Sequence, residues 1–309
     1  MIDLQRLEAF LFAAETLSFS EAAKHLHVTQ PTISHHIKSL EQDLGVELFS
    51  RSGRHIKLTE GGRLLLPWAR RLMRQSIEIE DMMTSLQQMA VGHLRIACST
   101  TAGKYILPQL AARFRTQCPG VHVSILSCTS EYIIPRLLEG EANLGVVSHE
   151  IPTEEGLEYQ AFFEDCITLI VPKDHPWTRL PSVGPEALLE EPFIIREPTA
   201  GTRRVMLAEL AKFDITLDDL NVFLELGNAE AIVRTVADGF GISFVSELAA
   251  ECAVYRGDVA VVPVEGIELR RWAYMVRRMF DVPYRPQEMF WEFIHDPENK
   301  DLIGMAQLH

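Results

Sequence analysis

Residues 19–49 read FSEAAKHLHVTQPTISHHIKSLEQDLGVELF, and this stretch decides the fold of the N-terminal part of the chain. Small and apolar side chains at its start predict a short helix, and a tight turn follows. Thr29 is placed to cap a second, longer helix, and Pro31 lies in the first turn, where a missing N–H costs little. This second helix is expected to end at Gly45.

One helix precedes this stretch and two strands follow it. Apolar residues at helical spacing predict an amphipathic helix within residues 2–18. Residues 46–49 and 55–58 are expected to form two short strands around a turn at Gly53. Three short helices followed by such a hairpin are typical of a winged helix-turn-helix, in which the third helix enters a DNA groove and the wing contacts phosphates.

The charge of the chain favours the same part of the molecule for contact with nucleic acid. The formal net charge is −14, but residues 1–74 hold ten Lys and Arg against eight Asp and Glu, whereas residues 75–309 hold nineteen against thirty-five. An acidic body repels a polyanion, so any contact with nucleic acid should be confined to the N-terminal part. The outward side of the third helix carries no carboxylate before Glu41.

Residues 59–89 predict one long helix, because they contain no internal turn cluster. Two sets of positions in it repeat every seven residues: Leu65, Leu72, Ile79 and Leu86, and Ala69, Ser76, Met83 and Ala90. This heptad pattern indicates a coiled coil, and a helix spanning roughly 46 Å with few partners in its own chain should pair with a second subunit. The alternative is a core helix of the large domain. Pro67 is expected to bend or begin the helix.

From residue 92 onwards, short apolar strands alternate with helices, which predicts an α/β body. The expected strands are 93–98, 121–126, 144–147, 166–171, 193–195, 222–226, 242–245, 259–262 and 272–276. The expected helices are 104–117, 132–139, 202–212, 229–237 and 286–294. The length suits two lobes joined by crossovers near 161–164 and 263–268, with a ligand cleft between them at the carboxyl ends of strands.

Three strand-to-helix segments, 98–103, 196–203 and 227–229, carry binding chemistry. Each places hydroxyl or amide side chains and free backbone N–H groups at the start of a helix, where a carboxylate, sulfate or phosphate binds well. The alternative for each segment is that its polar side chain only caps the helix.

The N-terminal sixty residues resemble the LysR-type transcriptional regulators. The residues that carry the resemblance are Phe19–Ala23, Val28–Ser34, Ile37–Glu41, Leu44–Phe49 and Leu58–Gly62. The resemblance implies an α/β protein with an N-terminal winged helix-turn-helix (1–58), a dimerising linker helix (59–91) and an effector-binding domain (92–309) similar to periplasmic binding proteins. Its lobe I would cover about 92–161 and 268–309, and its lobe II about 162–267. This chain has His35-His36 where many members have a basic residue, which leaves its base preference open and predicts a DNA affinity that responds to pH near ~6.5.

The resemblance implies a sequence-specific, DNA-binding transcriptional regulator controlled by a small, anionic metabolite between the two lobes. The expected DNA-binding residues are Thr29, Gln30, Pro31, Ser34, His35, Lys38, Arg51 and Arg54. The expected effector-binding residues are Ser99, Thr100, Thr101, Thr129, Thr202 and Asn228. The expected partners are an interrupted palindrome of double-stranded DNA in promoter regions, further copies of the chain in a dimer or tetramer, and RNA polymerase.

Other classes of protein fit the sequence less well. There is no GxSxG, HExxH or Walker motif, so we expect no enzyme activity, no metal and no cofactor. The five cysteines are an odd number without a CxxC pair, which favours a reducing cytoplasm, and no membrane span is expected. Two alternatives stay open: a solute-binding protein or enzyme with an incidental helical N-terminus, and a regulator that bends DNA without effector control.

Overall fold

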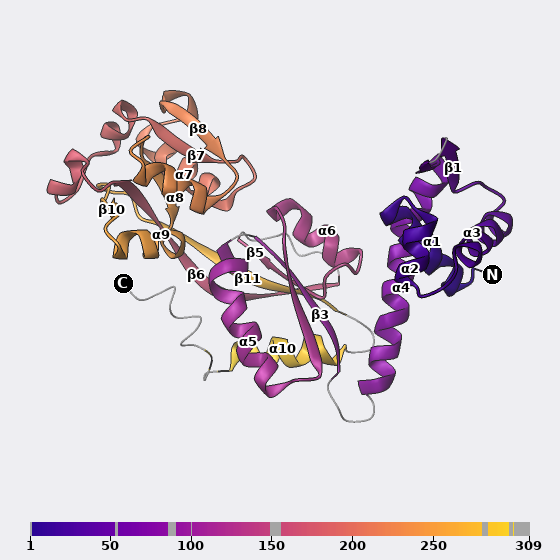
Figure 1. The fold of residues 1–309 in the computed structure, drawn as a ribbon. Coiled ribbons are helices and arrows are strands. Elements are labelled where there is room, and N and C mark those ends of the chain that lie inside the picture. Colours follow the sequence, from indigo (N-terminus) through magenta and orange to yellow (C-terminus); the bar gives the residue numbers. More distant parts are fainter. Residues whose placement is uncertain are drawn as a thin grey trace. The chain divides into compact units, whose positions relative to one another are not determined.

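The computed structural model describes residues 2–52, 55–85, 91–99, 101–148, 156–279, 284–296 and 299. The chain divides into two compact units, residues 1–84 and 85–309, each with hydrophobic cores of its own (Figure 1). None of the helices in the described ranges combines the length and the hydropathy that crossing a membrane requires.

The first unit contains the predicted winged helix-turn-helix. Its elements are α1 (Leu4–Thr16), α2 (Phe19–His25), α3 (Gln30–Leu44), β1 (Phe49–Ser52), β2 (His55–Leu58) and α4 (Glu60–Ser85). Thr29 is the N-cap residue of α3, although its hydroxyl bonds the hydroxyl of Thr32 at 2.8 Å instead of a backbone N–H. Gly45 ends α3 in the left-handed region, with φ of 71°, as its position after the helix predicted.

The first strand of the wing is shorter than the sequence suggested. It begins at Phe49 instead of residue 46, because the segment before it is tied to α3. The Glu41 carboxylate accepts hydrogen bonds from the backbone N–H groups of Leu48 (2.8 Å) and Phe49 (3.2 Å). Glu41 therefore fixes the start of the wing relative to α3. The expected turn at Gly53 lies outside the described residues.

Helix α4 has two different halves. Its first turns cover the core of the unit: Leu65, Leu66 and Met73 pack against the α1–α3 core, and Ala69 is fully buried in it. The expectation that this helix has few partners in its own chain is therefore wrong for its first half. The reason is that α4 follows the wing directly and covers the side of the α1–α3 core that would otherwise be open. Pro67 lies inside the helix. Further along, Leu72, Ile79 and Met83 are exposed, and Leu86 and Ala90 lie outside the described residues.

The second unit is built on a seven-stranded mixed sheet with strand order β10-β6-β11-β5-β3-β4, and β9 also pairs with β6. The strands of this sheet are β3 (Gly92–Cys98), β4 (Val121–Ser127), β5 (Leu144–Val147), β6 (Leu157–Pro172), β9 (Ser243–Ser246), β10 (Val259–Val261) and β11 (Leu269–Arg278). Strand β3 runs parallel to both β4 and β5, so the carboxyl ends of these three strands lie at one edge.

Helices cover both faces of the first lobe. They are α5 (Leu107–Gln117), α6 (Ile133–Leu138) and α10 (Arg285–His295). Leu94 and Ile96 of β3 join the core formed with α5 and α10, whereas Ala97 joins the core formed with α6. This alternation along one strand is what a sheet covered on both faces requires. The expected helix 104–117 starts as a π-helical turn, η1 (Ala102–Ile106), before α5.

The second lobe adds a small parallel sheet, β7 (Phe193–Arg196) and β8 (Val222–Leu226). Helix α7 (Gly201–Leu210) contributes to one core, and α8 (Ala229–Ala237) and α9 (Glu247–Tyr255) contribute to another. No helix is expected from the sequence over the residues of α9. Helix α9 follows β9 directly at Ser246, without the turn residues that would have marked its start.

Two long antiparallel strands join the lobes. The expected crossover at 161–164 lies within β6, which runs without interruption through sixteen residues. The expected strands 166–171 and 272–276 are parts of β6 and β11, which pair over their common length with one irregularity at Ala273/Tyr274 (Figure 1). The lobes therefore share one continuous pair of strands, which fixes where the cleft between them forms.

Candidate functional site

Helix α3 presents one polar face outward from the first unit. Ile33, Ile37 and Leu40 are buried in the core on its inner side. The side chains expected to contact DNA lie on the other side: Thr29, Gln30, Pro31, His35 and Lys38 are exposed and Ser34 is half-buried. This is the arrangement that a recognition helix needs, because its N-terminal residues reach base edges.

Arg51 belongs to β1, and neither its side chain nor Arg54 falls within the described part of the chain.

A cavity of about 240 Å³ lies between the two lobes of the second unit. Part of its wall is formed by residues that come directly after the carboxyl ends of parallel strands. They are Ser99 after β3, Cys128 after β4, Ser148 after β5, Glu197 after β7 and Gly227 after β8. The remaining lining residues are Thr101, Ser127, Thr129, Ser130, Arg196, Ala200, Gly201 and Arg271. Ligands bind at this edge of α/β sheets, where loops and helix N-termini converge.

One end of the cleft forms a polar cradle around Gly201. This residue begins α7, and no side chain caps the helix. The hydroxyl of Ser148, a residue that is 8% exposed, has no hydrogen-bond partner among the described residues. A Cβ placed on Gly201 would lie 2.6 Å from this hydroxyl and 2.8 Å from Nη1 of Arg271. The absence of a side chain therefore leaves space beside two donors and the start of a helix.

Arg271 is held by a buried carboxylate behind the cleft. Its Nε and Nη2 atoms donate to Asp165 Oδ2 at 2.8 and 2.5 Å, and Ser246 donates to Oδ1 at 2.6 Å. Asp165 is 1% exposed and Arg271 lies on β11, so this pair links the two strands that join the lobes. The carboxylate fixes the guanidinium and leaves Nη1 facing the cleft.

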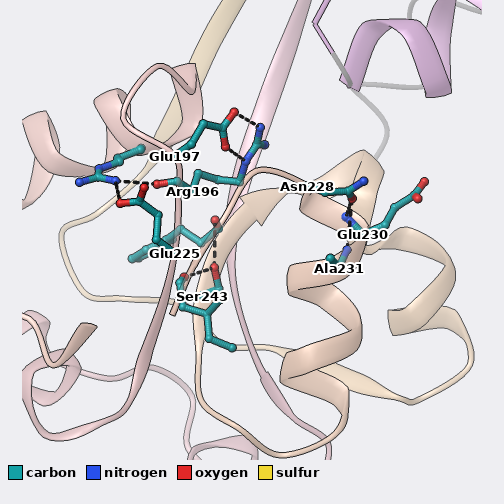
Figure 2. Close-up of polar contacts among 10 residues, drawn as sticks. Arg196, Glu197, Glu225, Asn228, Glu230, Ala231 and Ser243 are labelled. Carbon is teal, nitrogen blue, oxygen red and sulfur yellow. Dashed lines mark hydrogen bonds and ion pairs between the residues drawn. The ribbon is translucent and has the colours of Figure 1, made fainter. Parts of the chain in front are cut away.

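The second arginine of the cleft is paired with its neighbour in sequence. Glu197 accepts two hydrogen bonds from Arg196, from Nε at 2.8 Å and from Nη2 at 2.9 Å (Figure 2). The backbone oxygen of Arg196 accepts a hydrogen bond from Arg203, which also pairs with Glu225 (Figure 2). The two arginines and Glu197 give the lining a mixed charge.

The lobes also touch beside the cleft. Glu230 of α8 accepts a hydrogen bond from Tyr105 (3.1 Å) and pairs with Lys104 (2.5 Å), both from the π-helical turn η1. The hydrogen bond from Lys104 is the main reason why the pKa of Glu230 lies below its ordinary value. Burial is the main reason why the pKa of Tyr105 is raised, with the neighbouring carboxylate adding to it.

The cysteines near the cleft are poor nucleophiles. Burial raises the pKa of the Cys98 thiol to about 12, and burial also raises the pKa of Cys128. Both thiols therefore stay protonated at neutral pH, where a nucleophilic cysteine would be a thiolate.

Two family models match this chain. The model described as "Bacterial regulatory helix-turn-helix protein, lysR family" matches residues 4–63, and the model described as "LysR substrate binding domain" matches residues 87–296. The chain belongs to the LysR family of transcriptional regulators. It is a DNA-binding regulator with a winged helix-turn-helix and a two-lobed α/β effector-binding domain.

Several known proteins resemble this LysR-type regulator along most of their length. An uncharacterized HTH-type transcriptional regulator of Methanocaldococcus jannaschii is 32% identical over 93% of this chain and 96% of its own. The fold matches full-length CbnR complexed with its target DNA, with a TM-score of 0.74 and 23% identity over 95% of this chain and 99% of the other. The regulatory domain of CcmR from Synechocystis PCC6803, in complex with 2-PG, is 30% identical over 65% of this chain and 95% of that one, with a TM-score of 0.59.

The effector-binding domain of this LysR-type regulator brings together only some of the residues expected to bind the effector. Ser99, Thr101 and Thr129 line the cleft. Thr202 is buried beside it without lining it, and the Asn228 side chain caps α8 by accepting from the N–H groups of Glu230 and Ala231 (Figure 2). Thr100 lies outside the described residues.

Ten of the thirteen residues that line the cleft are missing from the expected set, among them the three of the cradle, Ser148, Gly201 and Arg271. Ser148 follows the strand 144–147, so its place at the carboxyl end of a strand was a usable signal. Gly201 lay in a segment with binding chemistry, but nothing in the sequence showed that its lack of a side chain matters. Nothing in the sequence marked Arg271 as a cleft residue, because only the pairing of β6 with β11 places it beside Asp165.

Proposed function

We propose that a small anion binds in the cleft around Gly201 and controls how this regulator binds DNA. The hydroxyl groups of Ser99, Thr101 and Thr129 and the arginines of the cleft are donors that suit carboxylate or phosphate oxygens. A cavity of about 240 Å³ suits a small metabolite.

The unpartnered hydroxyl of Ser148 is the observation that carries this proposal. A buried polar group without a hydrogen bond costs about 1–3 kcal/mol, so native proteins rarely keep one without a purpose. An anion seated at the start of α7 would accept from this hydroxyl and from the first N–H groups of the helix together. The complex of the CcmR domain with 2-PG supports a small anion as the class of ligand.

We propose that DNA is contacted by the outward face of α3, with Gln30, Ser34, His35 and Lys38 contacting bases and phosphates, and with Thr29 and the wing residues Arg51 and Arg54 on the backbone. The exposed Leu72, Ile79 and Met83 of α4 support pairing of two linker helices in a dimer or tetramer on an interrupted palindrome. We also propose that the DNA-binding domain ends at residue 58 and the linker helix at residue 91, with the lobe limits given above.

We further propose that the protein acts in the cytoplasm and that it contacts RNA polymerase at the promoters it regulates. We also propose that the chain is not an enzyme, a view that its regulator relatives and its protonated thiols support.

Filling the cradle or removing its donor should weaken the binding of the anion. We expect Gly201→Ala and Ser148→Ala each to weaken binding of inorganic phosphate at least tenfold, which corresponds to about 1.4 kcal/mol. The first variant removes the space and the second removes the donor. Isothermal titration calorimetry of the full chain with inorganic phosphate measures both effects.

The control for these variants is Gly184→Ala, which adds the same methyl group to a residue that does not line the cleft. Among the described residues other than its two chain neighbours, only the flexible end of Glu186 lies within 4 Å of a Cβ placed there, so phosphate affinity should stay that of the wild type. Equal phosphate affinity in all four proteins, or no binding to any of them, would contradict the proposed site.

A further inference from the structure

The cleft carries little net positive charge for a site that holds an anion. Arg271 is neutralised from behind by Asp165, and Arg196 is neutralised by Glu197, which itself lines the cleft. Both strong cationic groups are thus already satisfied by carboxylates of the chain. An anion entering this cleft meets hydroxyl groups and a helix start, but no unpaired guanidinium.

The Arg196–Glu197 pair uses the geometry by which a guanidinium binds a free carboxylate or phosphate. Nε and Nη2 lie on one edge of the guanidinium, and the two carboxylate oxygens accept from them in parallel at 2.8 and 2.9 Å (Figure 2). Such a two-point pair is a strong charge-assisted contact. The Glu197 carboxylate therefore occupies the edge of Arg196 that would recognise an anionic ligand.

The two partners are held very differently. Arg196 ends strand β7, its side chain is 10% exposed, and its backbone oxygen is fixed by Arg203. The Glu197 side chain is 24% exposed, and its carboxylate has no hydrogen bond other than those from Arg196 among the described residues. Rotation of the Glu197 side chain into solvent would break only its two hydrogen bonds from Arg196, whereas Arg196 would remain in place, buried and without a counter-charge until an anion replaced Glu197.

We propose that Glu197 is an internal competitor for the effector: its carboxylate holds Arg196 and is displaced when an anion binds. The inference rests on the proposed function of the cleft and specifies which residue selects the ligand. It requires an anionic group with two oxygens side by side, as in a carboxylate or a phosphate, because only such a group replaces both hydrogen bonds of Glu197. A neutral ligand leaves the pair closed.

The competition is tested by removing the competitor. Glu197→Gln keeps the size of the side chain and removes its charge, so we expect it to bind inorganic phosphate about tenfold more tightly than the wild type in calorimetry of the full chain. The matched control is Glu225→Gln, which removes a carboxylate of the same lobe that pairs with Arg203 and does not line the cleft. Its phosphate affinity should equal that of the wild type, which excludes a general effect of lowered negative charge.

A double variant shows whether the gain acts through Arg196. In Arg196→Gln/Glu197→Gln the whole pair is replaced, which avoids leaving one buried charge alone, and the gain of the single variant should disappear. Thermal unfolding of each variant checks that it is folded.

The outcomes separate this inference from the function on which it rests. Tighter binding by Glu197→Gln alone supports the competition, including the case in which only this variant binds phosphate measurably. Wild-type binding that depends on Ser148, with an equal or weaker affinity in Glu197→Gln, overturns the competition and leaves the anion site standing. Absence of phosphate binding in every variant overturns both.

Discussion

Replacing Asp165 by asparagine is expected to lower the free energy of unfolding of the effector-binding unit by about 3–5 kcal/mol. Asp165 is 1% exposed and accepts three hydrogen bonds, two from Arg271 and one from Ser246. The variant keeps the shape of the side chain but leaves the buried guanidinium of Arg271 without a counter-charge. Because β6 and β11 carry the two residues and join the lobes, the loss should also loosen the cleft.

Denaturant unfolding of the full chain measures this loss, since three of the four tryptophans, Trp177, Trp272 and Trp291, lie in this unit. The matched control is Glu268→Gln, which breaks the pair of the neighbouring Arg270 on the surface, where a pair contributes only about 0–1 kcal/mol. Equal, small shifts of the unfolding midpoint in the two variants would mean that the Asp165–Arg271 pair does not hold the unit together.

The Gly62→Ala variant is expected to lose specific DNA binding by about tenfold or more, equivalent to about 1.4 kcal/mol. Gly62 lies where the first turn of α4 crosses the start of the wing, and a Cβ there would overlap the carbonyl oxygen of Leu48. Overpacking of this kind costs about 1–3 kcal/mol and here would push the wing away from α3. The gain in helix propensity on replacing glycine, about 1 kcal/mol, does not offset a clash with backbone.

Fluorescence anisotropy with DNA from the region upstream of the gene measures this effect. Glu60→Ala, an exposed substitution in the same turn of α4, should bind that DNA like the wild type. If Gly62→Ala also bound like the wild type, the close contact between α4 and the wing would not matter for DNA recognition.

The parts of the structure that were predictable from the sequence are those set by local patterns. The turn before α3, the cap at Thr29 and the stop at Gly45 follow from caps, proline and glycine, whose conformational preferences are local. Short strands bounded by turn residues were also found, as with β5 at Leu144–Val147. The heptad pattern of α4 predicted a helix correctly but not that Ala69 belongs to the core of its own unit, because periodicity does not say which surface covers a face.

The cleft depended on contacts between distant segments, which the sequence does not show. Ser148 and Gly201 are 53 positions apart and meet only because parallel strands of two lobes end at one place. The Arg196–Glu197 pair was not predictable for a different reason. The two residues are adjacent in sequence, but their burial in the cleft depends on the whole fold, and this burial is what distinguishes the pair from an ordinary surface ion pair.

An effector in this cleft controls DNA binding only if it favours one arrangement of the protein over another. The contact of Glu230 with Lys104 and Tyr105 bridges the two lobes, so we expect any closure of the lobes around a ligand to change this contact. A difference of about 1.4 kcal/mol in effector affinity between two arrangements shifts their ratio tenfold.

We propose that α3 and the wing bind DNA while the acidic body, residues 75–309, makes no contact with it. The salt dependence of specific binding by the full chain tests this most directly, with Lys38→Ala compared with Lys212→Ala, an exposed lysine of the body. If Lys38 neutralises one phosphate, its removal lowers the slope of log affinity against log salt by about 0.9, and removal of Lys212 leaves the slope unchanged. An unchanged slope for Lys38→Ala, or an equal drop for Lys212→Ala, would show that this face of α3 is not the part of the protein that binds DNA.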